Sequence, residues 1–298
     1  MFNPNATLIE AFVNHALTEF CELFPAPEQS QLRTIEQACT TAFNTLLNCD
    51  CPYHDLNHTM LVTDAGFAIL KGRQTARGDL SAHEWIQAVV AMLFHDIGFV
   101  RQLLTADTAQ SSVINHNGET IQPPEGATDA ILSPHHVTRS VMYAAERFAK
   151  DEHIDTDLVT ECIEMTRFPV PADNAYQATE TLPGLVRAAD LIGQMADPQY
   201  LQKLTRLFAE FVEIGEAQRL GFDNAAELRA SFPEFFYSQV HPYIGDGIAY
   251  LKLTQDGWYW IANLYHHLNT DRGMDPKEKA PELVVDNSLL DRIREQHL

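Results

Sequence analysis

Residues 81–98, SAHEWIQAVVAMLFHDIG, are the stretch that decides the fold class. Ser81 and Glu84 have the spacing of a capping box, in which two side chains close the first turn of a helix. The run 85–94 that follows is almost wholly apolar, and Gly98 is placed to stop the helix. A helix that is apolar on all sides is buried, so we expect this segment inside a helical core.

The helical period recurs on both sides of this segment. Apolar residues repeat at steps of three or four, which is typical of helices that bury one face. The pairs Ser133-Pro134 and Asp197-Pro198 have the pattern of helix starts, whereas Gly72 and Pro169 are placed to end helices. We see no strand-like runs around an NG or DG turn. The sequence therefore predicts an all-α fold, with further helices over about 32–46, 56–70, 133–150, 157–167 and 199–214.

We expect one helical domain over residues 1–298, because no linker-like composition divides the chain. Within it we predict an N-terminal arm (1–29), a core (30–196) and C-terminal helices packed on the core (197–298). Residues 105–132 are rich in glycine and proline and lack a period, so they form a long loop. Such a loop is either a lid or binding segment, or an excursion without function.

Composition excludes several classes of protein. Hydrophobic residues make up 45% of the chain, which is enough for a sizeable core. Lys and Arg number 20 and Asp and Glu 41, so the net charge of −21 argues against nucleic-acid or anionic-membrane partners. The five cysteines show no CxxC pair, the N-terminus lacks a signal peptide, and the run 85–94 is too short to span a membrane. We expect a cytoplasmic protein, and self-association into a homo-oligomer stays open.

Histidine and aspartate recur in or beside apolar helical segments, where neither helix formation nor core packing explains them. They are His54 and His58, His95-Asp96, Asp190 and His135-His136. His54 and His58 lie four apart, so they share one face if they are helical. A charged aspartate beside a histidine at the end of a buried helix is costly unless it is paired or bound to metal.

Each of these residues alone has a simpler explanation. His54 could be a helix cap, His95 a core histidine, and Asp190 the buried partner of Arg187. Taken together, imidazole and carboxylate groups in this order suit first-row divalent metals. No cysteine takes part, which excludes a structural zinc finger.

His58, His95-Asp96 and Asp190, in this order, resemble the ligand set of the HD-domain metal-dependent phosphohydrolase superfamily over about 53–195. Residues 53–70, YHDLNHTMLVTDAGFAIL, resemble the YHN-x-x-H opening motif of class I cyclic nucleotide phosphodiesterases. The resemblance implies that His58 and His95 are metal ligands and that Asp96 bridges two metals. It implies that Asp190 completes the ligand set of the first metal. It also implies that His54 is the general acid.

Weaker similarities extend to substrate binding. His135-His136 resembles a paired-histidine segment of those phosphodiesterases, which implies a role for His136 near the substrate. Gln239 resembles the glutamine that holds the purine edge, with Tyr243 as a stacking ring. His136 or His116 could instead ligate a second metal.

Three positions depart from the class I pattern. Asp55 stands in place of asparagine, residues 97–99 read Ile-Gly-Phe instead of Asp-His, and Ser133 stands in place of glutamate. The second departure is similar to the broader bacterial HDIG group. The resemblance therefore implies phosphohydrolase chemistry more strongly than cyclic nucleotide specificity.

The expected activity is metal-dependent hydrolysis of a phosphodiester in a small nucleotide, with two divalent ions (Mn, Mg, Fe or Zn). The ions generate a hydroxide between them, and His54 protonates the leaving oxygen, oriented by Asp55 or Glu84. The alternatives are a nucleotidase or a dNTP triphosphohydrolase-like enzyme, and a signalling module that binds a nucleotide or partner without turnover. A purely structural scaffold is the remaining reading.

Overall fold

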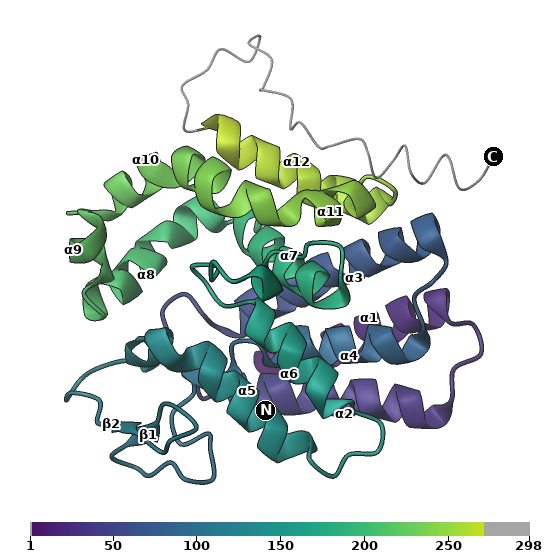
Figure 1. Cartoon of the computed structure of the whole chain (residues 1–298), viewed down its shortest axis with the longest axis horizontal. Coiled ribbons are helices and arrows are strands. Elements are labelled where there is room, and N and C mark those ends of the chain that lie inside the picture. The colour runs from purple at the N-terminus through teal and green to yellow at the C-terminus, as the bar shows by residue number, and fades with distance from the viewer. Residues whose placement is uncertain (1, 271–298) are drawn as a thin grey trace. The chain divides into compact units, whose positions relative to one another are not determined.

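The computed structural model describes residues 2–270 and confirms the all-α fold class (Figure 1). Strand pairing among these residues is limited to β1 (Ser112–Val113) and β2 (Thr120–Ile121). The α-helices are α1 (Pro4–Leu23), α2 (Gln29–Leu46), α3 (Leu56–Arg77), α4 (Ala82–Phe94), α5 (His136–Phe148), α6 (Thr156–Met165), α7 (Leu182–Met195), α8 (Tyr200–Glu213), α9 (Glu216–Leu220), α10 (Ala225–Phe235), α11 (His241–Leu251) and α12 (Gln255–Thr270). Shorter turns are η1 (Ile97–Phe99), η2 (Asp129–His135), η3 (Asn174–Tyr176) and the π-helical η4 (Phe236–Val240).

The described chain divides into two compact units. The first comprises residues 2–60 and 81–167, and the second comprises 61–80 and 168–270. Helix α3 therefore begins in the first unit and continues in the second. The division into arm, core and C-terminal helices stays a prediction, and its residues 271–298 lie outside the described residues.

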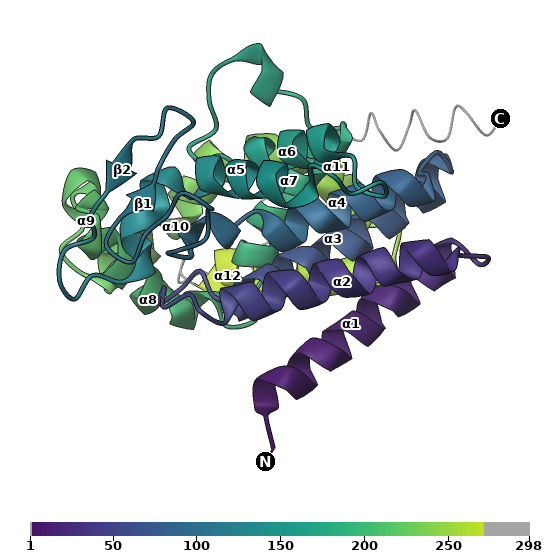
Figure 2. The ribbon, with the colours of Figure 1, turned by 90° about the horizontal axis from the view of Figure 1, so that it is seen from below.

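Helix α4 is the centre of the first unit. The predicted capping box is confirmed, since Ser81 and Glu84 each accept a hydrogen bond from the other's backbone N–H. Every residue over 85–94 is buried, as the apolar run predicts. Helices α2 and α6 pack on α4, and α1 lies against α2 (Figure 2). The ring of Phe20 in α1 reaches Trp85, with 5.1 Å between the ring centroids, so burial of both rings adds to the core.

The second unit is built around α7, which packs on α11 and α12. Gly72 was predicted to end a helix, and this is wrong, because α3 continues to Arg77. A Cβ atom at Gly72 would lie 2.2 Å from the carbonyl oxygen of Tyr250. The glycine is thus required where α3 passes the backbone of α11. Gly78, with a φ of 62°, follows the true end of the helix.

The region 105–132 contains structure that the sequence prediction missed. Strands β1 and β2 pair antiparallel, with Ser112 opposite Ile121, around a turn that includes Gly118 at a φ of 77°. Two residues per strand are too few to show an alternating pattern. The Ser133-Pro134 pair lies inside η2, so the following helix begins at His136 rather than at Ser133.

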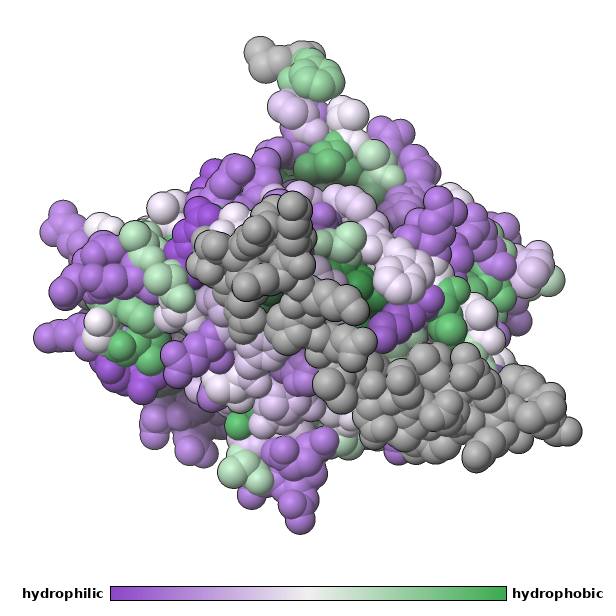
Figure 3. Space-filling view, turned by 90° about the horizontal axis from the view of Figure 1, so that it is seen from above, coloured by the Kyte–Doolittle hydropathy of each residue, from purple (hydrophilic) through white to green (hydrophobic). Residues whose placement is uncertain are grey.

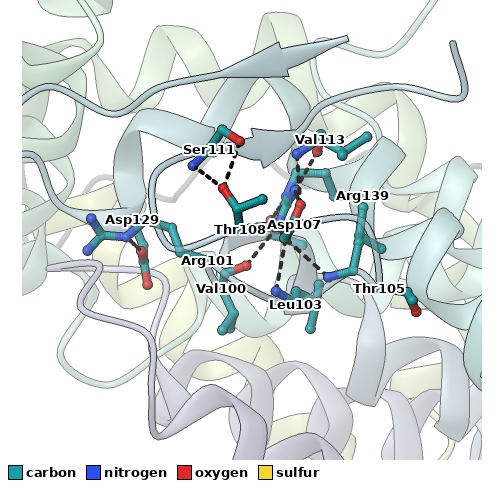
Figure 4. Close-up of polar contacts among 12 residues, drawn as sticks. Val100, Arg101, Leu103, Thr105, Asp107, Thr108, Ser111, Val113, Asp129 and Arg139 are labelled. Carbon is teal, nitrogen blue, oxygen red and sulfur yellow. Dashed lines mark hydrogen bonds and ion pairs between the residues drawn. The ribbon is translucent and has the colours of Figure 1, made fainter. Parts of the chain in front are cut away.

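The loop is tied to the first unit by the fully buried guanidinium of Arg139 in α5 (Figure 4). It donates to the carbonyl oxygens of Gly98, Val100 and Val113 and forms an ion pair with Asp107 at 3.0 Å. A second ion pair joins the loop residue Asp129 to Arg101. These contacts hold the loop at both ends, so residues 105–132 are an anchored segment and not a loose excursion.

We expect Arg139→Met to lower the free energy of unfolding by about 3–5 kcal/mol, because it leaves the buried carboxylate of Asp107 without its guanidinium partner. Urea denaturation measures this change. The matched control is Arg147→Met on the same helix, where the exposed side chain lies over the ring of Phe148 and should contribute less than about 1 kcal/mol. Equal losses in the two variants would show that Arg139 anchors nothing.

The surface drawn in Figure 3 is mostly hydrophilic, and its hydrophobic residues form small separate areas. None of the described helices combines the length and the apolar character that crossing a membrane requires.

Candidate metal centre

The centre is built from the residues that follow the buried helix α4. His95 is the C-cap of α4, and Asp96 connects it to η1. Only 1% of His95 and 4% of Asp96 is exposed. Nδ1 of His95 lies 2.7 Å from the carbonyl oxygen of Met92, which can only accept, so Nδ1 carries a proton. Nε2 of the same ring therefore faces the carboxylate of Asp96, with 3.2 Å to Oδ2.

His58 reaches the same carboxylate oxygen from the first turn of α3. Its Nε2 atom lies 3.2 Å from Oδ2 of Asp96. The side chain of Asp55 caps this helix and accepts hydrogen bonds from the backbone N–H groups of Asn57 and His58. The cap fixes the start of α3, so the Asp55 that departs from the class I motif serves to place His58.

His136 approaches the other oxygen of Asp96. It is the first residue of α5, its Nδ1 donates to the carbonyl oxygen of Ser133 at 2.6 Å, and its Nε2 lies 3.6 Å from Oδ1 of Asp96. Both oxygens of one buried carboxylate thus face imidazole nitrogens. The sequence named His136 as a substrate-binding residue, with metal ligation as the alternative, and this geometry favours the alternative.

The electrostatics keep the carboxylate ionised. Burial by itself raises the pKa of Asp96, but the electrostatic interaction with His95 and the contacts with His58 and His95 outweigh it and hold the pKa well below the usual range. Burial lowers the pKa of His136 despite the opposing charge of Asp96, so His136 is neutral near pH 7 and its Nε2 carries a lone pair. Carboxylate and imidazole groups of this kind are a donor set for a divalent cation.

His54 lies next to this set but outside the helix in which it was expected. Helix α3 begins at Leu56, so a shared helical face is not what brings His54 to His58. Their rings nevertheless meet edge to face, with 5.5 Å between centroids. The half-buried ring of His54 also stacks on Phe99 at 4.6 Å, with an angle of 16° between the planes.

Both carboxylates that were predicted to orient His54 lie at helix starts, and their orienting role stays a prediction. Asp55 caps α3, and Glu84 accepts hydrogen bonds from the backbone N–H and hydroxyl of Ser81 at the start of α4. Sequence reasoning missed Phe99, which follows the His-Asp-Ile-Gly motif directly. An aromatic residue at that position was the available signal.

Gly98 allows the two helical segments of the centre to meet. A Cβ atom there would lie 2.0 Å from the carbonyl oxygen of His136, and the backbone N–H of Gly98 donates to the hydroxyl of Ser140 at 2.9 Å. Gly98 was predicted as a helix stop, but α4 already ends at Phe94. Its role is close backbone approach to α5, which brings His136 to Asp96.

We expect Gly98→Ala to lower the free energy of unfolding by about 1–3 kcal/mol and to weaken metal binding, because the new methyl group forces His136 and η1 apart. Urea denaturation and isothermal titration with Mn²⁺ measure the two effects. Gly245→Ala is the control, since nothing lies within 4 Å of a Cβ there and alanine favours helix α11. Unchanged Mn²⁺ affinity in Gly98→Ala would contradict the proposed role.

The remaining predicted residues lie in other elements. Asp190 is half-buried on α7 in the second unit, and its predicted role as a metal ligand stays a prediction. Gln239 is exposed on the π-helical turn η4. Its assignment to substrate binding stays a prediction.

Tyr243 and His116 can be placed but not assigned. One ring face of Tyr243 on α11 is covered by the guanidinium of Arg187, which lies 4.6 Å from the ring centroid. Arg187 itself donates to the carbonyl oxygens of Tyr176 and Ala178. His116 is exposed between β1 and β2. The predicted roles of Tyr243 and His116 therefore stay predictions.

Comparison with known proteins gives one result. A family model described as Npun_R2479-like matches residues 2–271. The match spans His54, His58, Asp96, His136 and Asp190, so every residue of the candidate centre lies within it. No curated protein and no solved structure matches the chain.

Proposed function

Because this chain belongs to the Npun_R2479-like family, whose description states no activity, we propose its function from the geometry of the centre. The proposal is a metal-dependent phosphohydrolase that cleaves a phosphodiester in a small nucleotide. The observation that carries it is the surrounding of Asp96, whose two buried oxygens face Nε2 atoms of His58, His95 and His136.

Such a cluster needs positive charge. Protons on the imidazoles could supply it, but the His58 and His95 rings lie 5.5 Å apart, and two buried imidazolium ions at that distance repel each other. The carboxylate of Asp96 and the Nε2 lone pairs would instead hold one divalent cation, which would supply the charge of both protons. Imidazole and carboxylate oxygen are the ligands that Mn, Fe and Zn accept in proteins. The residues present thus fit a metal centre.

The assignment of ligands follows the two sides of Asp96. His58, His95 and Oδ2 of Asp96 would hold the first cation, and the sequence resemblance adds Asp190 as a further ligand. Oδ1 of Asp96 and His136 would hold the second. When bound, such cations offset the charge of a phosphate. They also lower the pKa of a bound water molecule to a value near neutral pH.

The chain itself supplies the proton for the leaving group. The oxygen that leaves from a nucleotide ester is a poor leaving group unless it is protonated as the bond breaks. The imidazole of His54 lies beside His58 and is outside the proposed ligand set. It is half-buried, and an imidazole titrates near the working pH. We therefore assign the general acid to His54.

A substrate panel with added Mn²⁺, Mg²⁺, Fe²⁺ or Zn²⁺ tests the proposal. It should contain cyclic nucleotides, cyclic dinucleotides, mononucleotides and dNTPs. We expect metal-stimulated cleavage of at least one phosphodiester. Release of phosphate from mononucleotides, or of triphosphate from dNTPs, would replace the phosphodiesterase proposal by one of the other phosphohydrolases. A metal-loaded protein that cleaves none of these compounds would contradict the enzyme proposal.

A further inference from the structure

Phe99 is a fully buried ring that contacts two of the histidines of the centre. Its ring stacks on that of His54 at 4.6 Å and 16°, and on that of His136 at 4.4 Å and 15°. The two imidazole rings themselves lie 6.4 Å apart and are within 28° of parallel. One phenyl ring thus lies against both imidazoles and nearly parallel to each of them.

The backbone on both sides of Phe99 is held by a single group. The guanidinium of Arg139 donates hydrogen bonds to the carbonyl oxygen of Gly98 at 2.7 Å and to that of Val100 at 2.8 Å. The Phe99 side chain packs in a small core with Cys51 and Ala130. Its ring is therefore a fixed surface, on which a neighbouring imidazole can be oriented.

We propose that Phe99 is the positioning residue for His54, an inference that rests on the proposed function of the centre. An imidazole that transfers a proton is usually oriented by a carboxylate, which adds negative charge and occupies one ring nitrogen. A phenyl ring orients the imidazole through its flat face, so it occupies neither nitrogen. Stacking on Phe99 can therefore fix the plane of His54 while both ring nitrogens stay available for proton transfer.

The inference predicts a selective defect in Phe99→Leu, which keeps an apolar side chain but removes the flat ring. With metal still bound, kcat for a nucleotide phosphodiester should fall by about 10- to 100-fold, because the acid is misaligned. A diester with a nitrophenolate leaving group needs little protonation, so its kcat should change far less. In a His54→Ala background, Phe99→Leu should cause no further loss on the nucleotide ester.

Phe43→Leu is the matched control, because Phe43 is a fully buried phenyl ring of α2 in the same unit and pairs with Phe12 instead of a histidine. It should leave the ratio of the two kcat values unchanged. Equal losses on both esters, no loss on either, or additive losses with His54→Ala would overturn the positioning role of Phe99 while leaving the phosphohydrolase proposal intact.

A crystal structure of Phe99→Leu tests the inference without any assay. We expect the imidazole of His54 to leave the plane that it has in the wild-type protein, or to adopt several orientations. A His54 ring that keeps its plane and order would overturn the inference. The crystal structure tests the orientation of His54 independently of activity. If the wild-type protein cleaves neither ester, the proposed function fails, but the effect of Phe99 on the His54 ring can still be observed.

Discussion

Asp96→Asn will purify without its metal and without hydrolytic activity. The substitution keeps the shape of the side chain and removes the negative charge that the Nε2 atoms of His58 and His95 approach at 3.2 Å. The amide nitrogen also places a donor where a cation would bind. Because both oxygens of Asp96 serve the centre, both cations should be lost. His95→Ala should behave in the same way. Elemental analysis and the phosphodiester assay on the same samples measure the two losses together.

Asp197→Asn separates metal loss from general damage to the fold. Asp197 is also buried, its carboxylate lies 2.6 Å from the ammonium of Lys203, and it belongs to the second unit. This variant should lose stability, because a buried charge loses its partner, yet it should keep its metal while it is folded. Metal retained in Asp96→Asn, or lost equally from both variants, would contradict the assignment of Asp96.

His54→Ala should keep its metal and lose turnover by about 10²- to 10⁴-fold, which is the usual contribution of a general acid. The imidazole contacts His58 edge to face but is outside the proposed ligand set, so metal binding does not require it. The loss should be largest for a nucleotide ester with an alkoxide leaving group and smallest for a nitrophenyl diester. Steady-state kinetics on the two substrates, with elemental analysis, distinguishes loss of the acid from loss of metal.

The control for His54 is His153→Ala, since His153 is an exposed histidine of the same unit. It should retain full activity on both esters. If His54→Ala cleaves the nucleotide ester at the wild-type rate, the acid is another group, and the argument for Phe99 as its positioning residue fails with it.

The helices could be predicted where their causes are local. The capping box at Ser81 and Glu84 and the apolar run behind it act within one turn or along one helix, and both are confirmed. Gly72 and Gly98 were both interpreted as helix stops, because a stop is the usual local reason for glycine. Glycine is instead required at these positions because the backbone of Tyr250 lies close to Gly72 and that of His136 close to Gly98. Both contacts join residues that are distant along the chain. No periodicity in the sequence reports such contacts.

The anchoring of the loop is another feature that only the folded chain shows. Asp107 and Arg139 are 32 residues apart, and either alone has the pattern of a surface residue. Their pairing in the interior depends on the path of the chain between them. The short strands β1 and β2 were missed for a related reason, since two residues each are held by a turn and not by a hydrophobic pattern.

The candidate centre could be predicted in part. The order of the predicted residues named His58 and His95, which the structure places beside one oxygen of the carboxylate of Asp96. The second face of Asp96 could not be predicted, because His136 reaches it only through the close approach that Gly98 allows. The stacking of Phe99 on His54 could not be predicted, because only the folded chain brings these two rings together.

The most direct test of the account is the position of the metal. Crystals grown with Mn²⁺ and measured for anomalous scattering will show where the cation binds. We predict a peak within about 2.3 Å of Nε2 of His58, of Nε2 of His95 and of a carboxylate oxygen of Asp96. Crystals that contain Mn²⁺ but show no peak at these three side chains, or show one only elsewhere, would contradict the central claim.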